Sequence, residues 1–244
     1  TARDTPSAAT VTPVVAAASD LQFALDEIVA RFEQDTGIAP RVTYGSSGNL
    51  ARQIEQGAPF ELFLSADEAF VDRLAARRLT RGRGHLYGLG RIVLFAPNGS
   101  PLELDPALDG LARRLASGQS GRIAVANPEH APYGRAAEQA LRARGLWQAA
   151  QPHLLIGENV SQAAQFASSG NADGGIIAYS LALGPALRER GTSALLPQSL
   201  HAPLRQRMVL LARASPAAER FYEYLRSPAS RAILERYGFL LPET

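Results

Sequence analysis

Residues 11–32 read VTPVVAAASDLQFALDEIVARF and contain the pattern that decides the fold. The first part, residues 11–18, is a short apolar run that ends in small residues. Apolar side chains then recur at helical spacing from Leu21 to Phe32, which predicts a strand, a tight turn and a helix. Repeats of this unit along a chain are typical of α/β proteins with parallel sheets.

The same unit recurs along the rest of the sequence. Further strands are predicted at residues 41–44, 61–64, 90–96, 123–126, 154–156, 174–178 and 205–213. Further helices are predicted over residues 50–55, 67–76, 133–144, from 160 onward, 217–225 and 229–237. The alternation of strands and helices is interrupted around Gly84, and the strand at 90–96 ends in Pro-Asn-Gly, which does not continue a strand. A second series of strand and helix units therefore begins there.

Two similarly built lobes are the predicted organisation. The segments are residues 1–10 as a flexible leader, 11–92 and 208–244 as a discontinuous lobe I, and 93–207 as lobe II. The strands at 90–96 and 205–213 would then cross between the lobes side by side as a hinge. The alternative is a single doubly wound sheet followed by C-terminal helices.

The composition of the 244 residues argues against several classes of function. Without cysteine there is no disulfide framework and no thiolate metal site. Without lysine a phosphate-binding P-loop is impossible. The net charge is +2 and the arginines are scattered, so the sequence shows no basic patch of the kind that binds nucleic acids. No apolar run approaches the roughly 20 residues of a membrane span, and we expect an exported protein whose signal peptide is absent from this sequence.

Four predicted strand-to-helix turns carry small or hydroxyl residues, at Ser19, Ser47, Tyr133 and Val160. In open α/β sheets ligands bind at this edge, the carboxyl ends of the strands. Helix N-termini there present unpaired amides and a partial positive charge, which suits anions. Ser19 and Ser47 also suit N-cap positions, where a hydroxyl only stabilises its own helix. The pattern favours an anion site if several of these turns meet.

A nucleophilic serine is a second interpretation of the turn at residues 45–48, GSSG. The nucleophile elbow of α/β-hydrolases requires G-x-S-x-G, and Tyr44 stands where the first glycine would precede Ser46. The four histidines lie outside any motif that would make one a base. We therefore expect no enzyme, while a Ser47 nucleophile would require a basic side chain beside it.

Four motifs resemble a known family. They are AAASDL at residues 16–21, GSSG at 45–48 followed by LARQIEQGAPFELFLSADE, NPEHAPYGRAAEQAL at 127–141, and ENVSQAAQF at 158–166. Together, over about residues 11–241, the chain resembles the periplasmic molybdate-binding proteins of ABC transporters. The resemblance implies the type II periplasmic binding protein fold: two α/β lobes, each a mostly parallel sheet flanked by helices, joined by two hinge strands around an oxyanion.

The resemblance also implies a site of neutral donors only. Matched motif by motif, they are the hydroxyl and amide of Ser19, the amide of Asp20, Ser47, and the amides of Tyr133 and Val160. The implied ligand is molybdate or tungstate, bound through its oxygens without a direct metal ligand and without a cofactor. A monomer in the periplasm would deliver it to the permease subunits of an ABC transporter. A cytoplasmic sensor of this fold would need a DNA-binding segment, and the sequence supplies none.

Two positions depart from the family pattern. Asp20 stands where some members have asparagine, and a carboxylate repels a dianion unless it turns away or is hydrogen-bonded. Such a carboxylate could instead accept the proton of hydrogen phosphate, so a phosphate or sulfate receptor is the alternative function. Some members bind with a tyrosine at the end of the strand where Ala178 stands here. Tyr179 follows one residue later, which reverses its direction, and we expect no contact from it.

Overall fold

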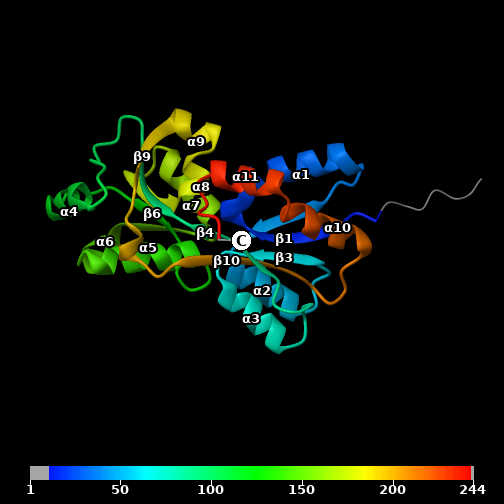
Figure 1. The fold of residues 1–244 in the computed structure, drawn as a ribbon. Helices are drawn as coiled ribbons and strands as arrows, with labels where there is room; N and C mark the ends of the chain where they lie inside the picture. The colour runs from blue at the N-terminus through cyan, green and yellow to red at the C-terminus, as the bar shows by residue number, and fades with distance from the viewer. Residues whose placement is uncertain (1–10, 243–244) are drawn as a thin grey trace, which may run out of the picture.

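The computed structural model describes residues 11–242 and contains two five-stranded sheets flanked by helices (Figure 1). The strand orders are β2-β1-β3-β10-β4 and β7-β6-β8-β5-β9. The predicted two-lobed α/β fold is confirmed, and a single doubly wound sheet is wrong. The expected leader, residues 1–10, and the last two residues of the expected lobe I lie outside the described residues. None of the helices within 11–242 has the length and apolarity that a membrane crossing requires.

The first sheet is largely parallel. Its strands are β1 (Val14–Ala18), β2 (Arg41–Gly45), β3 (Leu62–Ser65), β4 (His85–Gly90) and β10 (Leu204–Leu210). Its helices are η1 (Ser19–Leu21), α1 (Gln22–Thr36), α2 (Ser47–Glu55), α3 (Glu68–Ala76), α10 (Pro216–Leu225) and α11 (Pro228–Arg236). Strands β1, β2 and β3 run parallel, and β10 is antiparallel to β3 and β4. Helices α1, α10 and α11 cover one face and α2 and α3 the other (Figure 1).

The second sheet is built in the same way. Its strands are β5 (Ile92–Pro97), β6 (Ile123–Ala126), β7 (Leu154–Gly157), β8 (Gly174–Ala178) and β9 (Gly191–Leu195). Its helices are α4 (Asp109–Ala116), α5 (Pro132–Ala143), α6 (Trp147–Ala150), η2 (Gln151–His153), α7 (Val160–Ser168), α8 (Tyr179–Ala182), α9 (Pro185–Arg190) and η3 (Gln198–Leu200). Strand β6 is parallel to β7 and β8, and β5 is antiparallel to β8 and β9. One continuous apolar core lies around this sheet.

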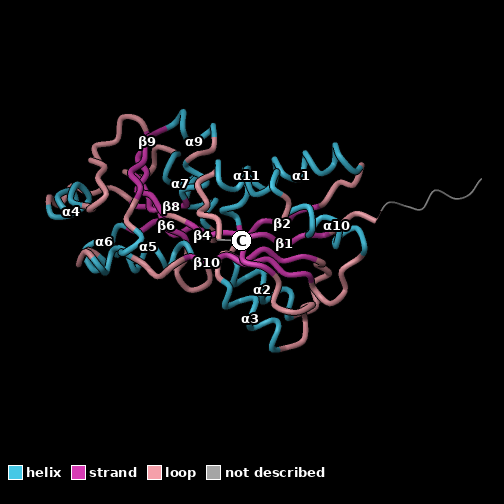
Figure 2. Tube along the Cα trace, in the orientation of Figure 1, coloured by secondary structure: helices cyan, strands magenta, loops and turns pink. Residues whose placement is uncertain are grey.

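The chain passes between the sheets twice (Figure 2). Strand β4 ends at Gly90 in the first sheet and β5 begins at Ile92 in the second. The return lies between the end of β9 at Leu195 and the start of β10 at Leu204, which pairs with Gly90. We propose Arg91 and residues 196–203 as the lobe boundaries, so all of β10 belongs to lobe I and the return precedes the expected boundary at 208.

Several elements differ from the pattern-based prediction. The predicted strand at 90–96 corresponds to β5, which begins at Ile92 and ends at Pro97, and β4, with two glycines in HLYGLG, was not predicted. Strand β10 ends at Leu210, and Leu211 forms only an isolated bridge with Thr80. Helix α4 and strand β9 were also missed. In α4, Leu111 and Leu115 lie four residues apart and are both buried, so the helical pattern was present in the sequence. Strand β9, GTSAL, has no such pattern and is defined by its pairing with β5.

Candidate functional site

A small cavity lies between the lobes, at the carboxyl ends of strands from both sheets. Its lining includes all five predicted ligand-binding residues, Ser19, Asp20, Ser47, Tyr133 and Val160. The structure therefore brings together turns that are far apart in the sequence. Residues not singled out as ligands also line it: Ala18, Gly45, Ser46, Ala66, Ala131 and Pro132. Ala66 belongs to the SADE segment that follows β3, so its position after a strand was the available signal.

Three helix N-termini point free amides at this cavity. Ser47 and Val160 are the first residues of α2 and α7, and Tyr133 is the second residue of α5. First-turn amides have no partner within their own helix, and across residues 11–242 these three have none elsewhere. The neighbouring Gly48 amide, by contrast, donates to the carbonyl of His130 at 2.9 Å. The free amides of Ser47, Tyr133 and Val160 thus belong to residues that line the cavity.

Two buried serine hydroxyls are oriented as donors. The Ser47 Oγ accepts a hydrogen bond from the Ala66 amide at 2.9 Å. The Ser19 Oγ accepts one from the Ser161 amide of the opposite lobe at 3.2 Å. A hydroxyl has one proton to donate, and in both serines it remains free because the backbone bond uses a lone pair. Each hydroxyl can thus donate to a ligand in the cavity.

The expected capping roles of these two serines are wrong. An N-cap residue has extended backbone geometry, and between β2 and α2 that residue is Ser46, whose Oγ accepts from the Asn49 amide. Ser47 is already helical. At the end of β1 the extended residue is Ala18, so Ser19 begins η1 and does not cap its own helix; its Oγ accepts instead from the first-turn amide of Ser161 in α7. Both hydroxyls are consequently available to the cavity.

The Asp20 side chain is completely buried and lies in a hydrogen-bonded row of polar groups. Its Oδ2 accepts from the Tyr133 hydroxyl at 2.9 Å, which in turn accepts from Gln206 Nε2 at 2.9 Å. The Gln206 Oε1 accepts from the Tyr87 hydroxyl at 2.8 Å. Burial raises the pKa of Asp20 to about 7, although hydrogen bonds from Gln206 and Tyr133 oppose the rise. Tyr87 and Gln206 belong to β4 and β10, and sequence patterns gave no signal for either.

The rim of the cavity is closed by contacts between the lobes, which we call the rim clasp: Ser46, Gly48 and Asn49 with His130 and Glu158. The Ser46 hydroxyl and His130 Nδ1 are 2.7 Å apart. The Asn49 amide Nδ2 donates to Glu158 Oε1 at 2.6 Å. With the Gly48 bond to His130, these contacts hold the start of α2 against lobe II. They describe a closed state.

The rim clasp gives little support to a hydrolase. His130 is bonded to Ser46, whereas Ser47 has no hydrogen bond to a basic side chain anywhere in residues 11–242. The Ser46 Oγ already accepts the capping bond of α2. Glu158 is 3.5 Å from His130 Nε2, and its side chain is 64% exposed and shared with Asn49. The condition set for a Ser47 nucleophile is not met.

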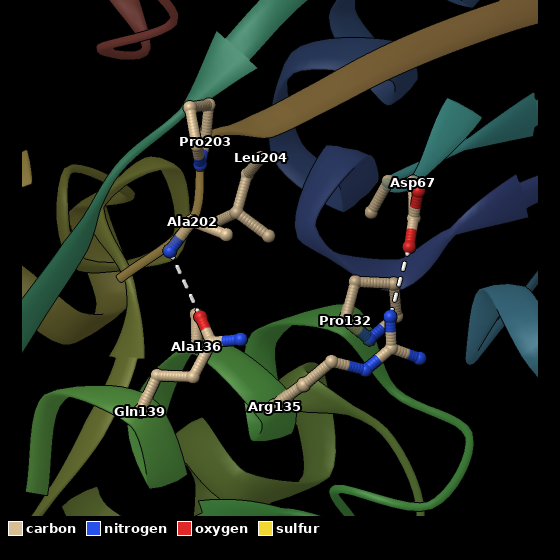
Figure 3. A pocket seen from close by; sticks show the side chains of 9 residues that line it. Asp67, Pro132, Arg135, Ala136, Gln139, Ala202, Pro203 and Leu204 are labelled. Atoms are coloured by element: carbon tan, nitrogen blue, oxygen red, sulfur yellow. Dashed lines mark hydrogen bonds and ion pairs between the residues drawn. The ribbon is translucent and has the colours of Figure 1, made fainter. Parts of the chain in front are cut away.

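A second cleft between the lobes is lined by an arginine, Arg135 (Figure 3). Its guanidinium lies 2.9 Å from a carboxylate oxygen of Asp67. The opposite wall is joined by a hydrogen bond from the Ala202 amide to the Gln139 side chain at 2.9 Å. Because Asp67 compensates its charge, this arginine is poorly suited to bind an anion. The cavity with the free amides is the better anion site.

Tyr179 lies away from the cavity. It is the first residue of α8, after Ala178 ends β8, and it is not among the residues that line the cavity. Its ring stands against Gly238, where a Cβ atom would come within 2.6 Å of it. The expectation that this tyrosine makes no contact with the ligand agrees with its place in the structure.

Known proteins with similar sequences and structures are bacterial binding proteins. The sequence profile described as "Bacterial extracellular solute-binding protein" matches residues 13–240. The molybdate-binding protein ModA of Rhodobacter capsulatus is 33% identical over 93% of this chain and 87% of its own length. The Azotobacter vinelandii periplasmic molybdate-binding protein superposes with a TM-score of 0.85 at 28% identity, covering 95% of this chain and 100% of that one. The sulfate-binding protein SubI of Mycobacterium tuberculosis shares the fold, with a TM-score of 0.75 at 16% identity over 94% and 86% of the two chains.

Proposed function

This chain belongs to the family of bacterial extracellular solute-binding proteins, and from this premise we propose that it captures molybdate between its lobes and delivers it to an ABC transporter. Tungstate, an oxyanion of the same shape and charge, is the second expected ligand. The donors are the hydroxyls of Ser19 and Ser47 and the amides of Ser19, Asp20, Tyr133 and Val160. The Ser47 amide adds a further donor to this set.

The observation that carries the proposal is the convergence of three free helix amides and two free hydroxyls on one small cavity. Helix N-termini carry a partial positive charge of about +0.5 each. Hydrogen bonds to an ionised acceptor are roughly twice as strong as neutral ones. Within a closed cleft these terms stabilise a dianion without a cationic side chain, and none of the arginines or histidines in residues 11–242 lines the cavity.

The arrangement of donors favours a fully ionised tetrahedral anion. A backbone amide or a hydroxyl fixed by a backbone bond offers a proton, so each ligand oxygen must act as an acceptor. The rigid helix starts also set the size of the cavity, and sulfate is expected to fit too loosely. Selection by size therefore ranks molybdate above sulfate, and the need for an acceptor at every oxygen disfavours a protonated ligand such as hydrogen phosphate.

Calorimetric titration with molybdate, tungstate, sulfate and phosphate tests the function. We expect molybdate and tungstate to bind in a one-to-one ratio and at least about 100-fold more tightly than sulfate, a difference of about 2.7 kcal/mol. The alternative, a phosphate or sulfate receptor, rests on Asp20 as an acceptor for a protonated ligand. Tight phosphate binding that disappears in the Asp20→Asn variant would establish that alternative and overturn the proposal.

The remaining features of the proposed role follow from the fold. We propose that the chain acts in the periplasm as an exported monomer, that its partners are the permease subunits of the transporter, and that it uses no cofactor and catalyses no reaction. Closure around the ligand would present the joined surfaces of both lobes to the permease. The oligomeric state can be measured by light scattering with and without molybdate, and a single mass of one chain is expected.

Loss of one contact of the rim clasp is predicted to accelerate ligand release. In Glu158→Gln the carboxylate loses its charge, and the bond from Asn49 becomes a neutral one. Because Glu158 is largely exposed, the effect is expected to be modest, about two- to fivefold in the dissociation rate, in the range of surface charge pairs. Glu223→Gln, which removes an exposed carboxylate from α10, is the matched control and should release molybdate at the original rate in stopped-flow measurements. Equal rates in all three proteins would show that the clasp does not hold the closed state.

A further inference from the structure

We propose that Asp20 serves in the closed site as a neutral carboxylic acid whose O–H donates a hydrogen bond to the bound oxyanion, so that capture takes up one proton. The inference rests on the proposed function and assigns a donor role to the Asp20 side chain, beyond that of its amide. It also gives a function to Asp20, the residue that departs from the family pattern.

The two carboxyl oxygens of Asp20 have different environments. Oδ2 accepts the hydrogen bond from the Tyr133 hydroxyl, whereas Oδ1 is buried and no donor among residues 11–242 reaches it with hydrogen-bond geometry. Gln206 and the backbone amides of Asp20 and Leu21 lower the pKa of the carboxyl, but burial outweighs them. Asp20 also lines the candidate cavity. A buried carboxylate oxygen without a donor is costly, because nothing replaces its water. Placing a proton on Oδ1 removes the charge and creates a donor beside the ligand.

The row of groups behind Asp20 fixes which oxygen carries the proton. Tyr87 donates to Gln206, Gln206 donates to Tyr133, and Tyr133 donates to Asp20 Oδ2. Every proton in the row points toward Oδ2, so this oxygen is an acceptor and the acid proton belongs to Oδ1. Gly90 makes room for the row, because a Cβ atom there would lie 2.3 Å from the Tyr133 hydroxyl and 2.5 Å from Gln206 Nε2.

The surroundings of Asp20 offer no cation to hold it in the ionised form. The titratable groups that face it are Tyr87 from β4 and Tyr133 from α5, and burial keeps the pKa of both hydroxyls well above the ordinary value. From β10 it meets the neutral Gln206, and from α8 the Ser180 hydroxyl, which donates to the Asp20 carbonyl at 2.7 Å. No arginine or histidine hydrogen-bonds to the carboxyl in the described part of the chain.

Closure of the lobes creates this environment. Asp20, Tyr87 and Gln206 belong to lobe I and Tyr133 to lobe II, so opening admits water to the carboxyl and returns its pKa toward the ordinary value of 3.8. Burial in the closed state raises the pKa to about 7. The closed state thus binds more protons than the open state. Protonation of Asp20 stabilises the closed state fully below about pH 4, and this stabilisation is lost as the pH rises through about 7. Proton uptake on capture is largest between these two values.

The acid form also contributes to the choice of ligand. A carboxylic O–H requires an acceptor on the ligand, which every oxygen of a fully ionised molybdate or sulfate provides. An ionised Asp20 would instead require a ligand that carries a proton, such as hydrogen phosphate. Protonation of Asp20 therefore favours the fully ionised anions that the other donors also select.

Calorimetric titration with molybdate at pH 6, in two buffers with different enthalpies of ionisation, measures the protons taken up. We expect close to one proton per molybdate bound for the original protein and close to none for Asp20→Asn, whose amide supplies the same hydrogen bond without titrating. The affinity of Asp20→Asn should stay within about tenfold and should not change between pH 5 and pH 8. That of the original protein should fall across this range. Tyr133→Phe removes a hydrogen-bond donor that lowers the pKa of Asp20. In this variant we expect the affinity for molybdate to decrease at a higher pH than in the original protein.

The outcomes separate this inference from the proposed function. Molybdate binding by both proteins without proton uptake in either would overturn the donor role of Asp20 and leave the function intact. Failure of molybdate to bind to either protein would overturn the function itself. Should Asp20→Asn fail to fold, the proton count of the original protein and the pH shift of Tyr133→Phe still decide the question.

Discussion

Replacing Gly48 by alanine is expected to weaken molybdate binding by at least about 100-fold while leaving lobe I folded. A Cβ atom at this position would lie 2.7 Å from the carbonyl oxygen of His130, on the opposite lobe. That oxygen accepts the Gly48 amide, so neither backbone can yield without breaking the bond. The lobes would stop short of full closure and move the amides of Tyr133 and Val160 away from the ligand. Losing two charge-assisted bonds costs about 3–6 kcal/mol.

The same substitution should not destabilise the helix in which it stands. Gly48 lies in the first turn of α2, and alanine favours a helix interior over glycine by about 1 kcal/mol. The thermal unfolding midpoint without ligand should therefore be unchanged or higher, and X-ray scattering with molybdate should show an open molecule. Undiminished affinity in Gly48→Ala would mean that the closed contact between α2 and His130 is not needed for binding.

Ser47→Ala is the second change with a large expected effect, a loss of affinity of about 30- to 200-fold. The hydroxyl donates to the ligand and accepts from the buried Ala66 amide. The variant loses a bond to a charged acceptor and leaves that amide unsatisfied, and each of these costs about 1–3 kcal/mol. Only the part that differs between free and bound protein appears in the dissociation constant, so we expect a net loss of about 2–3 kcal/mol.

Ser230→Ala provides the matched control for this prediction. Ser230 is equally buried in lobe I, and its hydroxyl donates to the Tyr224 carbonyl at 2.7 Å, far from the cavity. Both variants should unfold at a lower temperature, but only Ser47→Ala should lose affinity in calorimetric titration. If the two variants bind molybdate equally well, the hydroxyl of Ser47 is not a ligand donor.

Local patterns predicted the parts of the site that are made by local structure. Each strand-to-helix unit is specified by its apolar periodicity. Its turn follows the carboxyl end of the strand, and this position does not depend on distant parts of the chain. The placement of Ser19, Ser47, Tyr133 and Val160 around one cavity follows from this rule once the lobes face each other. That the two lobes face each other was predicted from the family resemblance, because the periodicity of a sequence does not show how two sheets are oriented relative to each other.

Contacts between distant elements could not be predicted in this way. Tyr87 lies on β4, whose two glycines weaken the strand pattern, and Gln206 stands between Arg205 and Arg207 in the polar half of β10. Tyr87 bonds to Gln206, and the bond from Gln206 to Tyr133 needs the space that Gly90 leaves at the end of β4. The N-cap of α2 was suggested at Ser47 and is Ser46, because both serines of GSSG satisfy the capping preference. Backbone geometry, which the sequence does not display, decides between them.

The central claim is that an oxyanion is bound between the lobes by neutral donors alone. A crystal structure of the complex with molybdate, with the anomalous signal of molybdenum, tests it most directly. We predict one strong peak in the cavity, with its oxygens within hydrogen-bonding distance of the Ser19 and Ser47 hydroxyls and the Tyr133 and Val160 amides, and no guanidinium in contact. A peak beside Arg135 in the cleft of Figure 3, with the cavity empty, would contradict the account.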